Sequence, residues 1–388
     1  RVMEPFFSIT YGNPSSFHHV GLDAKNAMMD ARVTMAHLLG AHDEEIIFTS
    51  GGTESDNLAV VGIPRANTVP IQAKLGLEIK PHVITSAIEH HAVLEPLLFL
   101  EKMKQIELTT LPVNRDGIVS VEEVERALKP NTVLVSIMTA NNEIGTLQPI
   151  ADIGRSLLVW RKEQKTAYPY FHTDACQAAG ALDLNVEKTH VDLLTMNGSK
   201  IYGPKGVGVL FVRRGVKVEP LIRGGGQERN IRSGTENVPS IIGLAKAFEL
   251  VQANREAENQ RLIALRDHLI EGLMTIPKTR LNGHPTERLP NNANLSFLDI
   301  EGEAAVLYLD AEGIMVSTGS ACASTSLDPS HVILATGLSY EAAHGSIRFT
   351  LGHDITAEDI EKVINVMPGV VERLRMMSPV SMDMKYFS

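Results

Sequence analysis

The sequence has very little cysteine, with only Cys176 and Cys322 among 388 residues. Two thiols cannot form a disulfide framework, and such low usage is typical of a reducing compartment. Basic residues are fewer than acidic ones, 36 against 46, so the formal net charge is −10. This balance argues against a nucleic-acid partner. No apolar run approaches the roughly 20 residues that a membrane-spanning helix needs. These absences exclude a disulfide-stapled secreted domain and argue against binding to nucleic acid or spanning a membrane.

Two common ligand-binding patterns are missing as well. The sequence contains neither an HExxH motif nor a pair of cysteines with CxxC spacing, so no metal site is predicted. The glycine run "RGGGQERNIRSG" at residues 223–234 does not lie between an early strand and its helix, and no acidic residue follows at the required distance. A dinucleotide-binding fingerprint needs both features. We therefore interpret the run as a loop.

What the chain does contain is an alternation of apolar, strand-like segments with helical ones. The strand-like segments are rich in Val and Ile and show almost no polar alternation, which indicates strands buried on both faces of a mostly parallel sheet. An α/β fold of this kind binds its ligands at the carboxyl ends of the strands. The predicted strands span residues 45–50, 82–88, 106–111, 132–138, 167–174, 191–196 and 207–212.

A change in composition indicates a second domain. No proline occurs between Pro239 and Pro277, so this stretch predicts one long helix or two helices joined end to end. Near the C-terminus, Thr356 and Asp359 resemble a capping box, and the helix that follows is expected to be interrupted at Pro368. We expect a large domain over residues 11–245. A smaller α/β domain would comprise residues 1–10 and 246–388.

Lys200 stands out because it follows an apolar strand and precedes a cluster of glycine and proline. Gly198, Gly203, Pro204 and Gly206 exclude a helix here, so Lys200 lies on a loop between two strands. It is either a solvated loop lysine or a lysine held for Schiff-base chemistry. The rest of the chain has to decide between the two.

Other predicted strands also end in polar groups. Gly52 and Thr53 follow the first strand and suit either a phosphate-binding turn or a plain turn capped by Thr53. Asp174 ends a later strand, where it either pairs with a protonated pyridine nitrogen or caps a helix at Ala175. His90 begins a helix after another strand and suits either ring stacking or packing and capping. Together these groups predict one site at one edge of the sheet.

Eight motifs extend this pattern. In order they are "FTSGGTESDNLAV", "EHHAVL", "ANNEIGTLQPI", "HTDACQAAG", "GSKIYGPKGVGVLFVRR", "RGGGQERNIRSGTENVPSIIGLAKA", "STGSACASTSLDPSHV" and "SIRFTLG". The chain resembles the class V aminotransferase superfamily of pyridoxal-phosphate enzymes, which have fold type I. Within that superfamily it resembles the cysteine desulfurases. The resemblance is collinear from about Tyr11 to Arg375.

The resemblance implies a role for each matching residue. Lys200 would bind the cofactor aldehyde covalently, Asp174 would pair with the ring nitrogen, and His90 would stack on the ring. Cys322, on a loop of small and polar residues that is expected to be mobile, would be the nucleophile. The other implied cofactor ligands are Gly52, Thr53, Asn142, Gln177, Asn197, Ser199 and Thr235, with Thr235 supplied by the neighbouring subunit of a homodimer.

Arg348 would take the substrate carboxylate with help from Asn142, since a guanidinium binds a carboxylate in a bidentate way. The implied reaction converts L-cysteine to L-alanine and leaves sulfur as a persulfide on Cys322. The sulfur would pass to an acceptor protein, such as a scaffold for iron–sulfur clusters or a protein of tRNA thiolation. Alternatives are a selenocysteine lyase, an aminotransferase of the same superfamily or a catalytically impaired scaffold of this fold.

The sequence departs from the family pattern in two places. Ser199 precedes Lys200 where the family usually has histidine, and Asn197 stands where it often has serine. Ser199 can donate a hydrogen bond to phosphate, but it cannot shuttle protons as imidazole does. The sequence also begins after the family's N-terminal strand and "AATT"-like loop. The expected location is the cytoplasm, or an organelle matrix where a targeting peptide precedes Arg1.

Overall fold

The computed structural model describes residues 1–319, 328–379 and 381–387 and divides into two compact units. The first unit contains residues 1–111, 121–139 and 149–255, and the second contains residues 112–120, 140–148 and 256–388. This division differs from the expected one, which ended the large domain at residue 245 and placed residues 1–10 in the small domain. The segment 140–148 joins the second unit through main-chain hydrogen bonds, such as that from Leu147 N to Glu287 O at 3.0 Å. Sequence order alone could not reveal this pairing.

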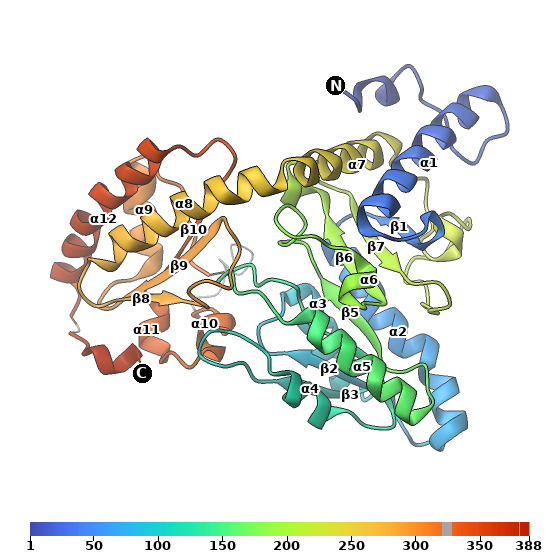
Figure 1. Cartoon of the computed structure of the whole chain (residues 1–388), viewed down its shortest axis with the longest axis horizontal. Coiled ribbons are helices and arrows are strands. Elements are labelled where there is room, and N and C mark those ends of the chain that lie inside the picture. The colour runs from blue at the N-terminus through green and yellow to red at the C-terminus, as the bar shows by residue number, and fades with distance from the viewer. Residues whose placement is uncertain (320–327, 380, 388) are drawn as a thin grey trace. The chain divides into compact units, whose positions relative to one another are not determined.

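A seven-stranded sheet forms the centre of the first unit (Figure 1). Every neighbouring pair is parallel except the two pairs that involve β7, which is antiparallel to β1 and to β6. The mostly parallel sheet predicted from the sequence is therefore confirmed. In spatial order the strands are β1 (Ile46–Thr49), β7 (Gly208–Val212), β6 (Leu193–Asn197), β5 (Tyr170–Asp174), β4 (Thr132–Ser136), β2 (His82–Ser86) and β3 (Glu107–Leu111).

Helices connect and cover these strands, because parallel strands need crossover connections. Each packs an apolar side against the unit, as α2 does with Leu58, Val60 and Ile63, all at most 2% exposed. The helices are α1 (His19–Leu39), α2 (Gly52–Leu75), α3 (His91–Lys102), α4 (Val121–Ala127), α5 (Ile150–Gln164), α6 (Val186–Thr189) and α7 (Val238–Ala253). The strands β1, β2, β5 and β6 run in one direction, so their carboxyl ends share one edge of the sheet.

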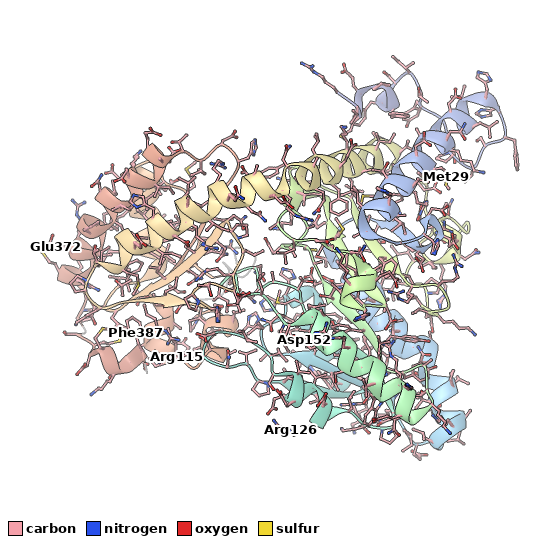
Figure 2. All side chains as sticks on the ribbon, in the orientation of Figure 1. Met29, Arg115, Arg126, Asp152, Glu372 and Phe387 are labelled. Atoms are coloured by element: carbon pink, nitrogen blue, oxygen red, sulfur yellow. The ribbon has the colours of Figure 1, made fainter. Side chains whose placement is uncertain are left out.

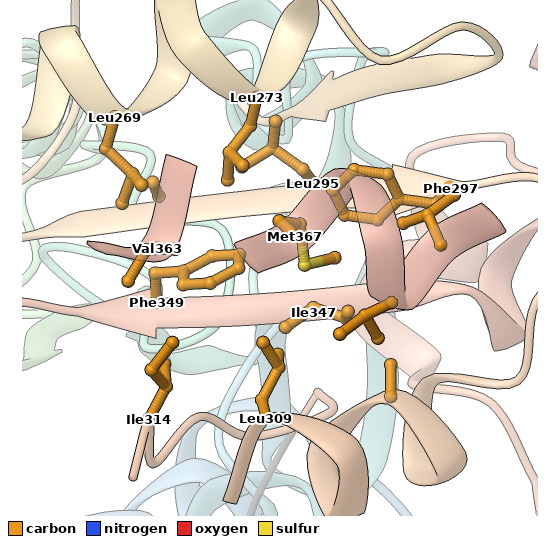
Figure 3. Close-up of a cluster of buried hydrophobic side chains, with 14 of the residues drawn as sticks. Leu269, Leu273, Leu295, Phe297, Leu309, Ile314, Ile347, Phe349, Val363 and Met367 are labelled. Atoms are coloured by element: carbon orange, nitrogen blue, oxygen red, sulfur yellow. The ribbon is translucent and has the colours of Figure 1, made fainter. Parts of the chain in front are cut away.

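The second unit is built on a three-stranded antiparallel sheet in the order β10-β9-β8. Its core is apolar and includes Leu273 from a helix, Leu295 and Phe297 from β9 and Met367 from the last helix (Figure 3). Burying such side chains supplies most of the driving force for folding. The elements are β8 (Thr279–Asn282), β9 (Asn292–Phe297), β10 (Ser346–Thr350), α8 (Arg255–Met274), α9 (Gly302–Ala311), α10 (His331–Ala335), α11 (Tyr340–His344) and α12 (Ala357–Met377).

Three predictions about helices have different outcomes. The proline-free stretch forms two helices joined end to end, because α7 ends at Ala253 and α8 begins at Arg255. The alternative of one long helix is therefore wrong. The capping box of α12 is confirmed by bonds between Thr356 and Asp359 in both directions. The expected interruption at Pro368 is wrong, because α12 continues to Met377. Buried side chains beyond the proline, among them Val371, offset the lost hydrogen bond.

The C-terminal end of the described chain is fixed within the second unit. Figure 2 shows Arg115 beside Phe387. Arg115 and Arg280 both donate to the carbonyl of Phe387, at 3.0 and 2.9 Å, and the Phe387 side chain is buried. Among the described residues, no helix is both long enough and apolar enough to cross a membrane.

Candidate active site

The turn between β1 and α2 leaves main-chain donors available. Helix α2 begins at Gly52, and no described residue accepts a hydrogen bond from the N–H groups of Gly52, Thr53 or Glu54. Thr53 is exposed in the first helical turn, and Gly51 occupies the cap position without a side-chain bond, so the alternative of a Thr53 cap is wrong. Free N–H groups at the start of a long helix attract an anion such as phosphate.

Gly52 is required here because of its surroundings. A Cβ atom on Gly52 would lie 2.7 Å from the Cys176 sulfur and 3.3 Å from the Asn197 Cβ. The turn after β1 therefore packs directly on residues that follow β5 and end β6. Only glycine permits this approach.

Asp174 is the last residue of β5 and is 6% exposed. Its Oδ1 accepts a hydrogen bond from the Cys176 N–H at 2.8 Å, and its carbonyl accepts one from Thr139 N at 2.8 Å. The carboxylate thus holds a turn, but no helix begins at Ala175, so the helix-cap alternative is wrong. The backbone fixes this carboxylate at the carboxyl edge of the sheet.

Lys200 lies at the same edge, directly after β6. The expectation that no helix forms here is wrong for residues Gly198–Ile201, which make a short 3-10 helix, because a single turn ends before Gly203 and Pro204.

The Lys200 side chain is exposed, and its positive charge acts on Cys176, whose thiol lies against Asp174. Burial raises the pKa of the Cys176 thiol well above its usual range, the negative charges of Asp174 and Asp56 raise it further, and Lys200 opposes them. The charges of Lys200 and Asp174 therefore both act on the Cys176 thiol.

Asn197 precedes this short helix and caps it. The Asn197 Oδ1 accepts from the Ser199 N–H at 3.4 Å and lies 3.5 Å from the Ser199 hydroxyl. Both contacts are at the long limit of hydrogen bonding, so the Ser199 hydroxyl can turn to another acceptor.

His90 caps helix α3, with its Nδ1 accepting from the Ala92 N–H at 3.0 Å. The capping alternative is therefore confirmed, and the stacking role stays a prediction. Since Nδ1 accepts, the neutral imidazole carries its proton on Nε2. The bond to the helix thus selects one tautomer.

The structure adds three buried polar residues that sequence analysis missed. Asp56 and Glu89 are at most 1% exposed, and His172 is completely buried. Burial lowers the pKa of His172 to about 3, so it is neutral between Ser136 Oγ at 2.8 Å and Thr195 Oγ1 at 3.1 Å. The available signals were Asp56 within the apolar helical segment "SDNLAVV" and Glu89 directly before His90.

Both missed acids are held neutral. Burial raises the pKa of Asp56 well above its usual range, and the charge of Asp174 raises it further. Burial raises the pKa of Glu89 to about 8, against hydrogen bonds from Ser86 Oγ at 2.6 Å and Met138 N at 3.0 Å, with a further rise from Asp174. Glu89 and Asp56 therefore lie near Asp174 in their neutral forms, because burial and the charge of Asp174 both oppose their ionisation.

Glu89 gives a testable dependence of stability on pH. Its folded pKa of about 8 exceeds the reference value of 4.5, so between these values the unfolded chain releases a proton that the folded chain keeps. The free energy of unfolding should therefore fall as pH rises through this window, by up to about 1.4 kcal/mol per pH unit from this group. Glu89→Gln keeps the acceptor oxygen but does not titrate, so the free energy of unfolding of this variant should fall less steeply as pH rises. Urea unfolding at several pH values measures the difference, and parallel profiles would contradict the expectation.

The remaining predicted residues are distributed between the two units. Gln177 is half-buried and Thr235 exposed, both in the first unit. Asn142 and Arg348 belong to the second unit, where Arg348 Nη1 donates to the Asn142 carbonyl at 3.0 Å. Residues 320–327, which include Cys322 and most of its expected mobile loop, lie outside the described residues.

The residues of the first unit fit pyridoxal phosphate. The free N–H groups at Gly52 suit its phosphate, the fixed Asp174 carboxylate suits its ring nitrogen, and the exposed Lys200 amine suits its aldehyde. Among the residues that the structure describes, no three His, Cys, Asp or Glu side chains gather as metal ligands.

Comparisons with known proteins identify the family of the chain. The family model "Aminotransferase class-V" matches residues 1–363. Cysteine desulfurase IscS of Methanosarcina thermophila is 51% identical over 98% of this chain and 90% of its own. A solved "NifS-like protein" has a TM-score of 0.84 at 36% identity, covering 97% of this chain and 94% of its own. A structure titled "SspA in complex with cysteine" has a TM-score of 0.76 at 36% identity and covers 90% of this chain and 93% of its own.

The chain therefore belongs to the class-V aminotransferase family, and within that family to the cysteine desulfurases, whose cofactor is pyridoxal 5'-phosphate.

Proposed function

We propose that this enzyme converts L-cysteine to L-alanine and receives the sulfur on Cys322 as a persulfide. A bond forms between the Cys322 sulfur and the substrate sulfur, and the bond between the substrate's Cβ and sulfur breaks. The electron pair of the broken bond stays on carbon, which is protonated to the methyl group of alanine. The two thiols supply all the protons, and no external oxidant or reductant is needed.

The chain's own residues divide this work. Pyridoxal phosphate, when bound, supplies an electron sink next to the substrate's α-carbon. Lys200 would hold the cofactor through its aldehyde, and its amine, once released, would move the α-proton of the substrate. Asp174 would hold the ring nitrogen and keep it protonated, and His90, with its proton on Nε2, would hold the ring face. The substrate carboxylate binds Arg348, whose position is supported by the Asn142 carbonyl.

The remaining ligands and partners are part of the same proposal. The first unit is the cofactor-binding domain, with Gln177 and Asn142 at the ring hydroxyl and with Gly52, Thr53, Asn197 and Ser199 around the phosphate. Thr235 reaches the phosphate of a second copy of the chain, so the enzyme is a homodimer. The second unit carries Cys322, the acceptor is a protein such as an iron–sulfur scaffold, and the enzyme works in the cytoplasm.

One observation carries the proposal: a free helix start at Gly52, the fixed Asp174 carboxylate and the Lys200 amine meet at one edge of one sheet. The decisive experiment adds L-cysteine to the holoenzyme and measures the peptides by mass spectrometry. We expect one extra sulfur on the peptide that contains Cys322, and alanine in the solution. The SspA structure solved with cysteine supports this choice of substrate.

Cys322→Ser is the control, because it replaces the thiol with a hydroxyl of similar size and so removes the sulfur nucleophile. It should form no modified peptide and little alanine. Sulfur added to the Cys176 peptide instead would contradict the assignment of the nucleophile. Alanine production that is unchanged in Cys322→Ser would contradict the desulfurase mechanism itself.

A further inference from the structure

Glu143 is a buried carboxylate in the turn of residues 141–145, and the mechanism above gives it no part. It is 1% exposed and lies in the second unit. Asn141 Oδ1 accepts from the N–H groups of Glu143 and Ile144, at 2.8 and 3.0 Å. The Glu143 carbonyl accepts from the side-chain amides of Asn292 and Asn294 on β9, at 3.3 and 3.2 Å. The backbone of Glu143 is thus fixed to the sheet of its unit.

The carboxylate of Glu143 contacts residues on both sides of the stretch that contains Cys322. Ser330 Oγ donates to Glu143 Oε2 at 2.5 Å and also caps α10 by accepting from the Val332 and Ile333 N–H groups. A Cβ atom on Gly319 would lie 3.0 Å from Glu143 Oε2 and 2.9 Å from the Ser330 Cβ. Gly319 therefore closely approaches the carboxylate that accepts from Ser330, although the two residues are eleven positions apart in sequence.

The same turn also supports Arg348. The Asn142 carbonyl accepts from Arg348 Nη1 at 3.0 Å, directly beside Glu143 in sequence. Arg348 and Ser317 exchange two main-chain hydrogen bonds, at 2.7 and 3.2 Å. The turn thus holds the arginine proposed for the substrate carboxylate and, through Ser317 and Ser330, the described residues on either side of the Cys322 stretch.

We propose that Glu143 is a positioning residue for sulfur transfer, which fixes both ends of the stretch that carries Cys322 to the turn that supports Arg348. The inference rests on the proposed function. A hydrogen bond from a hydroxyl to a buried carboxylate is short and strong, so it defines a position closely. Reactions between a nucleophile and a bound substrate are sensitive to such positions, and a displacement of about 1 Å costs on the order of 10²-fold in rate.

The test compares wild-type holoenzyme with Glu143→Ala and Glu143→Gln in a single turnover with cysteine. One readout is the change in visible absorption of the bound cofactor, which reports substrate binding. The other is the rate at which the Cys322 peptide gains sulfur. Glu143→Ala should slow the gain of sulfur on the Cys322 peptide by on the order of 10²-fold, and it should leave the absorption change nearly unchanged. Glu143→Gln should restore sulfur gain to within about threefold of wild type, because its amide oxygen can accept from Ser330.

Asp299→Asn is the matched control, since Asp299 is another buried acid of the second unit. It pairs with Lys278 at 2.7 Å and accepts from Met382 N at 2.6 Å, away from the turn. Both readouts should stay at the wild-type level. Ser330→Ala should resemble Glu143→Ala, and the double variant should be no slower than either single one.

The outcomes separate this inference from the proposed function. If Glu143→Ala adds sulfur at the wild-type rate, or loses the absorption change and the sulfur together, Glu143 does not position the nucleophile. If wild type and Asp299→Asn themselves add no sulfur to Cys322, the proposed function fails instead.

Discussion

Replacing Lys200 with alanine should abolish covalent attachment of the cofactor and reduce alanine production from cysteine by at least about 10³-fold, because both amine exchange and movement of the α-proton depend on this side chain. Reduction with borohydride fixes the cofactor to its lysine, so digestion of wild-type protein should give a peptide around residue 200 with the added mass of the reduced cofactor. In Lys200→Ala no peptide should carry that mass.

Lys246→Ala is the control for this experiment. Lys246 lies on α7 of the same unit and pairs with Glu249 at 2.9 Å on the surface. Its replacement removes one lysine without touching the carboxyl edge of the sheet, so the cofactor mass and the activity should remain. Borohydride fixation at another lysine in Lys200→Ala would show that the Schiff-base lysine has been assigned incorrectly.

The second large effect is expected from Asp174→Asn, which keeps the size of the side chain and removes its charge. An amide cannot hold a proton on the ring nitrogen as a carboxylate does, so the electron sink is weakened. We expect a loss of activity on the order of 10²–10³-fold, the range seen when one preorganised electrostatic contact is removed. The absorption of the bound cofactor should shift and become dependent on pH near neutrality.

Two comparisons make the Asp174 result interpretable. Asp183→Asn removes an exposed acid of the same unit, which pairs with Lys188 at 2.6 Å, and it should change neither readout. Asp174→Asn should also lower the pKa of Glu89, because the charge of Asp174 contributes to raising it. If Asp174→Asn keeps both wild-type activity and the wild-type spectrum, another group must hold the ring nitrogen.

Sequence reasoning reached the proposed cofactor site because the residues proposed for it follow from local pattern. Buried parallel strands are continuous apolar runs, and their carboxyl ends must share an edge, so Asp174 and Lys200 could be placed together before any coordinates were available. The helix-cap alternative for Thr53 is wrong, because whether a hydroxyl caps a helix depends on where the first turn begins. Sequence reasoning failed for Pro368, because burial of later residues such as Val371 outweighs one lost hydrogen bond.

The sequence by itself determined the α/β class, the order of the strands along the chain and, through its motifs, the family and the cofactor. These depend on periodicity and on short segments in which neighbours along the chain decide the structure. Only the tertiary structure decided that residues 140–148 join the second unit, that Asp56 and Glu89 lie buried near Asp174, and that Gly319 closely approaches the Glu143 carboxylate that accepts from Ser330. Such contacts join residues far apart in sequence, and both the pKa of a buried acid and the position of a loop end depend on what packs around them in space.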